Sequence, residues 1–191
     1  KLLKAGAASI LLTGSTSSIS GAAEPNCSQP APATLETALM AQPISVDGSV
    51  AYVGTIVHPA FGTAVQNGGV FVLTRDKSLV RRQIKPKAEE MTIGAKTITI
   101  QRDGTEITRA IPKRMHAFFT VLQAAVFNQG ISELPPLPHR ITSTTTGWTA
   151  RISLRQSGGG SIVFSGCGET LQAIDLEMAG NQNRQIRFVS Q

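Results

Sequence analysis

The feature that most constrains this fold is a series of short segments in which apolar and polar residues alternate. Such alternation is typical of β-strands that bury one face and expose the other to water. Ten segments have this pattern or are rich in β-branched residues: 49–57, 65–74, 79–85, 97–102, 106–111, 139–145, 148–155, 160–166, 169–178 and 184–190. A sheet of about ten antiparallel strands does not stay flat, so the sequence predicts a mainly β fold, with helices, curled into a barrel or an open half-barrel.

Strand pairing and strand faces are both indicated by the sequence. Residues 97–102 and 106–111 are separated by a turn containing Asp103-Gly104, which is a strong signal for a β-hairpin. Apolar residues two or four positions apart share a face in several segments, namely Ile98 and Ile100, Ile107 and Ile111, Ile152 and Leu154, Ile174, Leu176 and Met178, and Ile186 and Phe188. We therefore expect one apolar and one solvated face, with the apolar face on the inside of the curl.

Two helices are predicted among the strands. A short amphipathic helix begins near Leu35 and ends before Pro43, and a longer one covers 113–128 and is followed by Gly130 at a typical C-terminal position. The apolar stripe of the longer helix consists of Met115, Phe118, Phe119, Leu122, Ala125 and Val126. Two helices are too few to cover both faces of the sheet, so we expect them to act as plugs or lids on the concave side.

The chain is expected to contain three segments. Residues 1–23 combine a basic start, a short apolar run and small residues before the end, which is typical of a secretory signal peptide; a buried N-terminal helix is the weaker alternative. Residues 24–33 form a proline-containing linker, and residues 34–191 form a single domain. The net charge of +6 falls to +4 once the two lysines of the first segment are removed, and the scattered basic residues do not favour nucleic-acid binding.

Cys27 and Cys167 are the two cysteines, and export would place them in an oxidising compartment. They either form a disulfide that closes most of the chain or remain unpaired thiols. They lie far apart from each other, and the three histidines, His58, His116 and His139, add no metal-ligand spacing, so we expect neither a metal nor another cofactor.

No motif for catalysis is present in the sequence. It contains no Gly-x-Ser-x-Gly, P-loop, His-Glu-x-x-His or Cys-x-x-Cys pattern. Glu89 and Glu90 are adjacent carboxylates, which point to opposite faces in a strand, and we expect both on the solvated surface. The sequence predicts no catalytic residue and favours a binding protein over an enzyme.

Several segments together resemble the LolA-like family, the relatives of the periplasmic carrier of outer-membrane lipoproteins. The resembling parts are Gly69 to Leu73, Leu79 to Arg82 with Lys85-Pro86, the paired strands at 97–111, the amphipathic helix, Gly147-Trp148, Ile162 to Gly166, Gly180, and Ile186 to Phe188. They cover about residues 69–190. The chain is most similar to a divergent branch whose members accompany lipid or polyene exporters.

The resemblance implies an unclosed β-barrel with a helical lid and an apolar cavity for acyl chains. It also implies an arginine on the strand before a Lys-Pro step that holds the lid and governs release, for which Arg81 and Arg82 are the candidates. Val80 and Ile84 share a face with Arg82, so the strand phase nominates Arg82 as the inward residue. The alternative is that both arginines reach solvent along their long stems. The residues expected to contact or gate the ligand are Arg82, Arg81, Phe71, Leu73, Phe118, Phe119 and Leu122.

The resemblance and the absence of catalytic motifs predict a monomeric periplasmic carrier for a lipoprotein or another acyl-bearing lipid. Its expected partners are acyl chains, an inner-membrane exporter and an outer-membrane acceptor, and no nucleic acid. Two alternatives remain open: a non-catalytic envelope interaction module whose core is packed solid, and an accessory protein of a lipid exporter.

Overall fold

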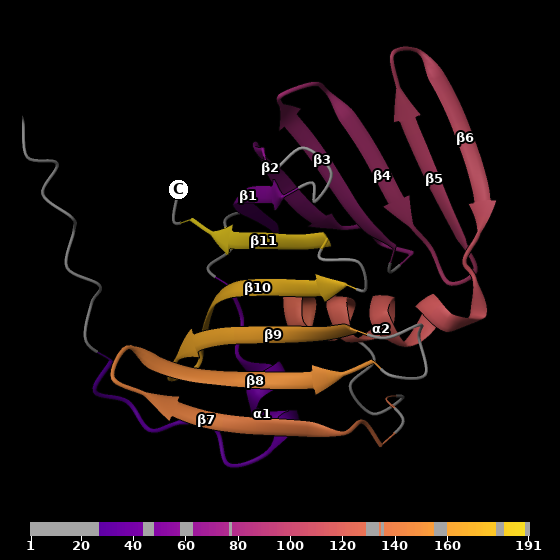
Figure 1. Cartoon of the computed structure of the whole chain (residues 1–191). Helices are drawn as coiled ribbons and strands as arrows, with labels where there is room; N and C mark the ends of the chain where they lie inside the picture. The colour runs from indigo at the N-terminus through magenta and orange to yellow at the C-terminus, as the bar shows by residue number, and fades with distance from the viewer. Residues whose placement is uncertain are drawn as a thin grey trace, which may run out of the picture.

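The fold is an antiparallel sheet of eleven strands that curls without closing (Figure 1). The computed structural model describes residues 27–43, 48–57, 63–76, 78–128, 134, 136–154, 160–178 and 182–189, so the predicted signal peptide lies outside the described residues. The strands are β1 (Ser49–Val57), β2 (Ala64–Leu73), β3 (Leu79–Lys85), β4 (Glu89–Ile93), β5 (Thr97–Arg102), β6 (Thr105–Ala110), β7 (His139–Thr144), β8 (Gly147–Ser153), β9 (Gly160–Cys167), β10 (Thr170–Met178) and β11 (Gln182–Phe188). The two helices are α1 (Leu35–Met40) and α2 (Lys113–Phe127).

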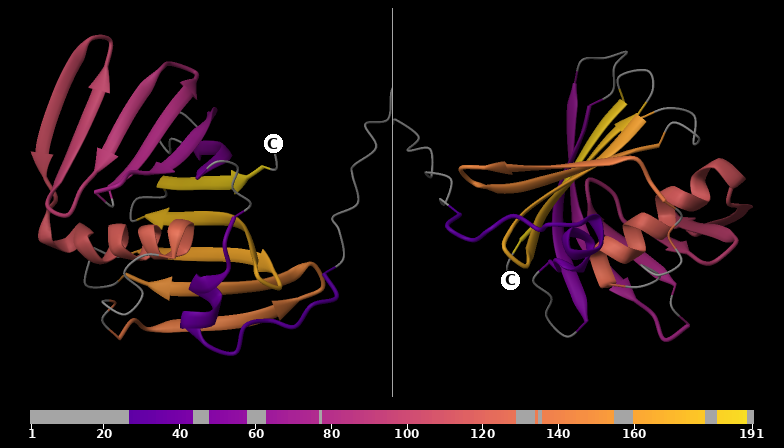
Figure 2. Two further views of the ribbon diagram at one scale, coloured as in Figure 1. Left: turned by 180° about the vertical axis from the view of Figure 1, so that it is seen from behind. Right: turned by 90° about the horizontal axis from the view of Figure 1, so that it is seen from below.

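The strand order explains why a helix must cross the sheet. The order is β6-β5-β4-β3-β2-β1-β11-β10-β9-β8-β7, so the first and last strands pair in the middle and β6 and β7 form the two edges. The chain between these edges contains α2, whose 15 residues span about 22 Å at 1.5 Å per residue. Figures 1 and 2 show α2 lying across one side of the sheet. The predicted half-barrel with a helix on its concave side is therefore confirmed.

Strand β4 is the element that the sequence did not predict. It is only five residues long, and it begins with Glu89 and Glu90, whose charges hide the alternation. Its pairing with both β3 and β5 makes the β1–β6 half of the sheet an uninterrupted series of hairpins.

The two faces of the sheet differ as the sequence predicted. We call the face that packs against α2 the concave face and the opposite one the convex face. The core lies on the concave face, and the pairs Ile98–Ile93, Ile174–Phe164 and Ile152–Ile162 are register partners within it. Its largest fully buried side chains are Trp148, Phe71, Phe164, Leu39, Leu79, Ile152, Ile162, Leu171, Ile174, Val50, Val121 and Val126.

Helix α2 is buried unevenly along its length. Val121, Leu122, Ala124, Ala125 and Val126 in its C-terminal half are all buried, whereas Met115, Phe118 and Phe119 in its N-terminal half are only partly buried. The helix ends at Asn128, which adopts the left-handed conformation with φ 53° and donates its backbone N–H to the Ala124 carbonyl at 2.8 Å. The predicted terminator, Gly130, lies outside the described residues. No helix among the described residues is long and apolar enough to span a membrane.

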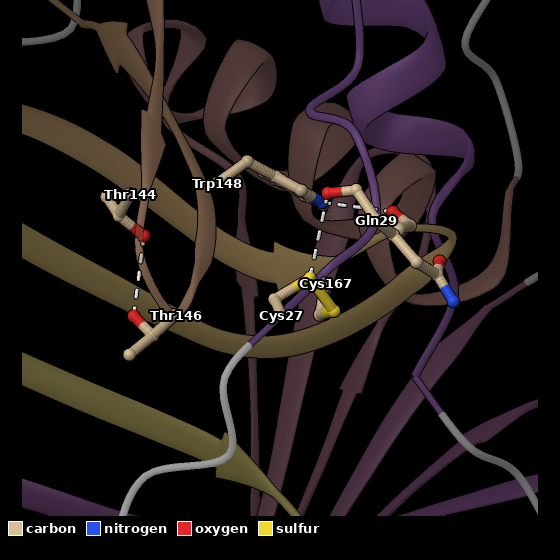
Figure 3. Close-up of a disulfide and its surroundings, with 7 residues drawn as sticks. Cys27, Gln29, Thr144, Thr146, Trp148 and Cys167 are labelled. Carbon is tan, nitrogen blue, oxygen red and sulfur yellow. Dashed lines mark hydrogen bonds between the residues drawn. A yellow bond between two sulfur atoms is a disulfide. The ribbon is translucent and has the colours of Figure 1, made fainter.

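Helix α1 and the segment before it are anchored to the β7–β10 side. Thr34 caps α1 by accepting the Thr37 backbone N–H at 3.2 Å, while the Thr37 hydroxyl accepts the Thr34 backbone N–H at 3.0 Å. Cys27 and Cys167 form a disulfide with a Cα–Cα distance of 5.7 Å, close to Trp148 (Figure 3). The question left open by the sequence is thus answered in favour of the disulfide, which fixes the predicted linker segment to the end of β9.

Candidate functional site

The candidate site lies on the concave face of β1–β6, beside the less buried N-terminal half of α2. A row of register partners crosses these six strands, made of Val50, Phe71, Arg81, Met91, Ile100 and Ile107. Burial decreases along this row from β1 to β6. Val50 and Phe71 are buried, Met91 and Ile100 are partly buried, and Ile107 is 45% exposed. The row is apolar except at Arg81.

Arg81, and not Arg82, is the arginine that faces inward. Arg81 lies between Phe71 and Met91 on the concave face, and its side chain is only 16% exposed. Arg82 is on the convex face, where its side chain is 58% exposed and its Nε donates to Glu90 Oε2 at 2.8 Å. The prediction that Arg82 faces inward is therefore wrong.

The error came from apolar residues on both faces of β3. Leu79 and Val80 are both buried, although they point to opposite faces. Ile84 is 65% exposed on the convex side, at the extra residue of a register shift between β2 and β3. Because Val80 and Ile84 are the convex neighbours of Arg82, the strand phase pointed to the wrong face.

Glu89 faces the same side as Arg81 and forms an ion pair with it. Its side chain is 19% exposed, so the expectation that Glu89 lies on the solvated surface is wrong. Glu90 points the opposite way and pairs with Arg82, which confirms that the adjacent carboxylates occupy opposite faces. The two ion pairs join β3 to β4 on both faces of the sheet.

Tyr52 on β1 is buried close to this ion pair. The residue is 2% exposed, and its ring lies 4.7 Å from that of Phe71, measured between centroids. Its hydroxyl has no hydrogen-bond partner among the described residues, and the same is true of the buried Arg81 Nε. Burial raises the pKa of Tyr52, with Arg81 lowering it and Glu89 raising it by smaller amounts, so the hydroxyl is a neutral donor at physiological pH.

Arg184 on β11 completes the group. It pairs in register with Ile56 and Leu176, and it is an exposed residue at the end of the concave face. Desolvation of its guanidinium and the like charge of Arg81 lower the pKa of Arg184, while Glu89 raises it. We call Tyr52, Arg81, Glu89 and Arg184 the polar cluster.

Three members of the polar cluster, Tyr52, Glu89 and Arg184, were not predicted as site residues from the sequence. The sequence did contain a signal for the inward position of Arg184. It lies two residues before Ile186 and four before Phe188, and these two residues were predicted to share the inward face. Glu89 would have followed from recognising β4 as a strand paired with β3. Tyr52 had no signal of its own, because its role depends on neighbours from distant parts of the chain.

A backbone feature brings the strands of the site close together. Gly69 lies between Tyr52 and Gln83 in register, at the β2–β3 register shift. A Cβ atom at Gly69 would come within 1.9 Å of the Arg82 carbonyl oxygen, so only glycine permits this approach.

The apolar residues predicted for the site are all placed near the core. Phe71 is buried on the concave face, and Leu73 is a partly buried residue at the end of β2. On α2, Leu122 is buried, while the partly buried rings of Phe118 and Phe119 make an edge-to-face contact with centroids 5.0 Å apart. Their expected role in ligand contact stays a prediction.

The chemistry of the polar cluster suits a bound anion better than a metal. Its two guanidinium groups outnumber its single carboxylate, and arginine cannot ligate a cation. Within the part of the chain that the structure describes, no three His, Cys, Asp or Glu side chains are grouped to hold a metal ion.

Polar depressions are also present on the convex side of the sheet. One of about 490 Å³ is lined by side chains that include Thr149, Ser165, Asp175 and Arg187. Another of about 610 Å³ is lined by residues around the Arg82–Glu90 pair and the β5–β6 turn. No member of the polar cluster lines the first depression, whereas Glu89 is among the residues that line the second.

Comparisons with known proteins give only distant similarities. No protein-family model matches the chain, and no curated protein matches its sequence. Among solved structures, LprF from Mycobacterium bovis is 11% identical with a TM-score of 0.31, over 75% of this chain and 84% of LprF. The lipoprotein LppX from Mycobacterium tuberculosis is also 11% identical with a TM-score of 0.31, over 74% of this chain and 85% of LppX. Similarity at this level carries no argument about function, so the half-barrel rests on the strand order and register described above.

Proposed function

We propose that this protein is a non-catalytic carrier that binds the acyl chains of an amphiphile between α2 and the concave face. The single observation that supports this most is the uneven burial of that face. Its β8–β10 side is sealed by α1 and the C-terminal half of α2, whereas the β4–β6 side carries apolar residues that are only partly covered. Exposed apolar surface on a concave wall is what an acyl chain would cover.

The driving force for such binding is transfer of methylene groups out of water. Each buried methylene contributes about 0.8 kcal/mol, so a long chain can bind tightly without any specific polar contact. Met91, Ile98, Met115, Phe118 and Phe119 are the partly buried residues that would line the chain. The N-terminal half of α2 would have to shift to admit a ligand, and it is the less buried half.

The expected setting of this function is the periplasm, with an inner-membrane exporter as donor and an outer-membrane component as acceptor. The disulfide between Cys27 and Cys167 supports an oxidising compartment.

The rival function, an interaction module with a solid core, is favoured by the large side chains that are fully buried on the concave face, such as Trp148 and Phe164. The two proposals make opposite predictions for a charged residue placed in the partly covered region. Ile100 lies there, and Thr99 is its neighbour on the opposite face of β5.

The test measures displacement of an environment-sensitive fatty-acid dye by palmitate in the parent protein, in Ile100→Glu and in the matched control Thr99→Glu. A carrier should bind the dye, lose most binding in Ile100→Glu and keep it in Thr99→Glu. Absence of dye binding in the parent protein, together with absence of extractable lipid, would favour the solid-core module.

A further inference from the structure

We propose that the polar cluster recognises the head group of the bound amphiphile, and that this head group carries a single negative charge on oxygen, as a phosphodiester or a carboxylate does. This inference rests on the proposed function and names the class of amphiphile that the concave face accepts.

The net charge of the polar cluster favours an anion. Arg81 and Glu89 neutralise each other in their ion pair, which leaves the charge of Arg184 uncompensated. Arg184 lies on the concave face of β11 opposite Ile56 of β1, four residues along that strand from Tyr52, and both Arg81 and Glu89 act electrostatically on its guanidinium. A monoanion placed between Arg81 and Arg184 would bring the cluster to neutrality, and guanidinium groups bind such oxyanions in two-pronged geometry.

The polar cluster also has unused hydrogen-bonding capacity beside this charge. The Tyr52 hydroxyl and the Arg81 Nε are buried, and neither has a hydrogen-bond partner among the described residues. Buried polar groups are normally paired, and an unpaired one in a folded protein calls for a ligand or another explanation. Both groups donate a hydrogen, which is what an oxyanion requires.

The polar cluster lies at the border between apolar surface and solvent. Arg81 adjoins Met91, from which the partly covered row continues to Ile100 and Ile107. Arg184 is exposed, so a head group can be reached from solvent while the chain extends along the row. A purely structural Arg81–Glu89 bridge between β3 and β4 would account for neither the second arginine nor the two unpaired donors.

The experiment compares three ligands with the same chain, namely palmitate, palmitoyl lysophosphatidylglycerol and the uncharged monopalmitoylglycerol, below their aggregation concentrations. Dissociation constants are measured by calorimetry or dye displacement with the full chain. Both anionic ligands should bind about tenfold or more tightly than the neutral one, since hydrogen bonds to charged groups are the strong ones. Preference for only one of the two anions would identify carboxylate or phosphodiester as the source.

Arg184→Gln should bring the anionic and neutral affinities to within about threefold, because the uncompensated charge is removed. Arg187→Gln is the matched control on the same strand, because Arg187 pairs with Val53 on the convex face, and it should keep the preference. Glu89→Gln should strengthen binding of the anions and leave the neutral ligand unchanged, which keeps the test valid if Arg184→Gln does not fold.

The outcomes separate this inference from the proposed function. Equal affinities for all three ligands, with no change in either cluster variant, would overturn the head-group inference and leave the carrier function intact. Failure of all three ligands to bind would overturn both.

Discussion

Among single residues, Arg81 should contribute more to the free energy of unfolding than its neighbour Arg82, because Arg81 points inward. Arg81→Leu leaves Glu89 without its partner in a mostly buried place, which should lower the free energy of unfolding by about 1–3 kcal/mol. Arg82→Leu removes an exposed pair with Glu90 and should cost less than about 1 kcal/mol. Urea denaturation of both variants measures the difference.

A double variant identifies the cause. Adding Glu89→Gln to Arg81→Leu should recover part of the loss, because the unpaired charge disappears. Equal losses in the two single variants would contradict the assignment of Arg81 to the concave face.

The unpaired hydroxyl of Tyr52 gives a second prediction at this scale. Tyr52→Phe keeps the ring that stacks on Phe71 and removes a buried donor without a partner. The variant should be as stable as the parent or more stable, by up to about 2 kcal/mol, in the absence of ligand. Thermal unfolding of lipid-free protein measures this, and a loss of more than about 1 kcal/mol would show that the hydroxyl already has a partner in the free protein.

At the scale of elements, the start of α2 is weak by its own chemistry. Its N-cap is Pro112, which provides no side-chain hydrogen bond, and the first turn contains no acidic residue but begins with Lys113 and Arg114. Positive charges at a helix N-terminus oppose the helix dipole. The half of α2 that is least buried is therefore also the half with the least intrinsic helix stability.

Lys113→Glu should strengthen this end of α2 by about 0.3–1 kcal/mol, because it replaces an unfavourable charge by a favourable one. If this half of the helix opens to admit ligand, dye exchange should become slower in stopped-flow measurements. Lys87→Glu, in the exposed β3–β4 connection, makes the same change of charge away from α2 and should leave exchange unchanged. Identical exchange rates in both variants would contradict a moving α2.

The convex side of β8–β10 is held by a polar network that predicts a dependence on pH. Glu177 on β10 receives a hydrogen bond from Arg151 Nη2 on β8 at 2.9 Å and one from the Ser161 hydroxyl on β9 at 2.7 Å. The bond from Arg151, and after it that from Ser161, lowers the pKa of Glu177 below its ordinary value of 4.5. The ionised carboxylate of Glu177 therefore stabilises the folded state. This stabilisation is fully present above the ordinary pKa of 4.5 and is lost as the pH falls through the lower pKa that Glu177 has in the folded protein.

Glu177→Gln should remove this contribution, so that the unfolding midpoints of variant and parent converge as the pH falls through the lowered pKa of Glu177 and diverge above it. Ser161→Ala removes one of the three hydrogen bonds that Glu177 receives, leaves the two from Arg151, and should have a smaller effect in the same direction. A constant difference between Glu177→Gln and parent at every pH would contradict the linkage.

The strands differ in how well the sequence predicts which of their faces points inward. On β10 and β11, polar residues alternate with Ile174, Leu176, Ile186 and Phe188, so period two assigns the inward face correctly. On β3, Leu79 and Val80 are buried on opposite faces, so the period carries no information about Arg81 and Arg82. The polar cluster arises from β1, β3, β4 and β11 together, and such a juxtaposition follows only from strand order.

At the scale of the whole molecule, the pairing of β1 with β11 places the two halves of the sheet side by side and leaves β6 and β7 as free edges. The concave side is therefore spanned by α2 rather than closed by hydrogen bonds between the edges (Figure 2). A concave face that is covered by a packed helix can be uncovered when side chains shift. A closed barrel would instead have to break backbone hydrogen bonds between its strands.

If acyl chains lie on the concave face, photocrosslinking will locate them there. A palmitate analogue with a diazirine in its chain is bound, irradiated and located by peptide mass spectrometry. The account predicts adducts at partly buried concave residues such as Met91, Ile98 and Phe119. The exposed apolar residues Val53 and Ile84 of the convex face serve as an internal control and should remain unmodified. Adducts at these two positions, with none on the concave face, would contradict the account.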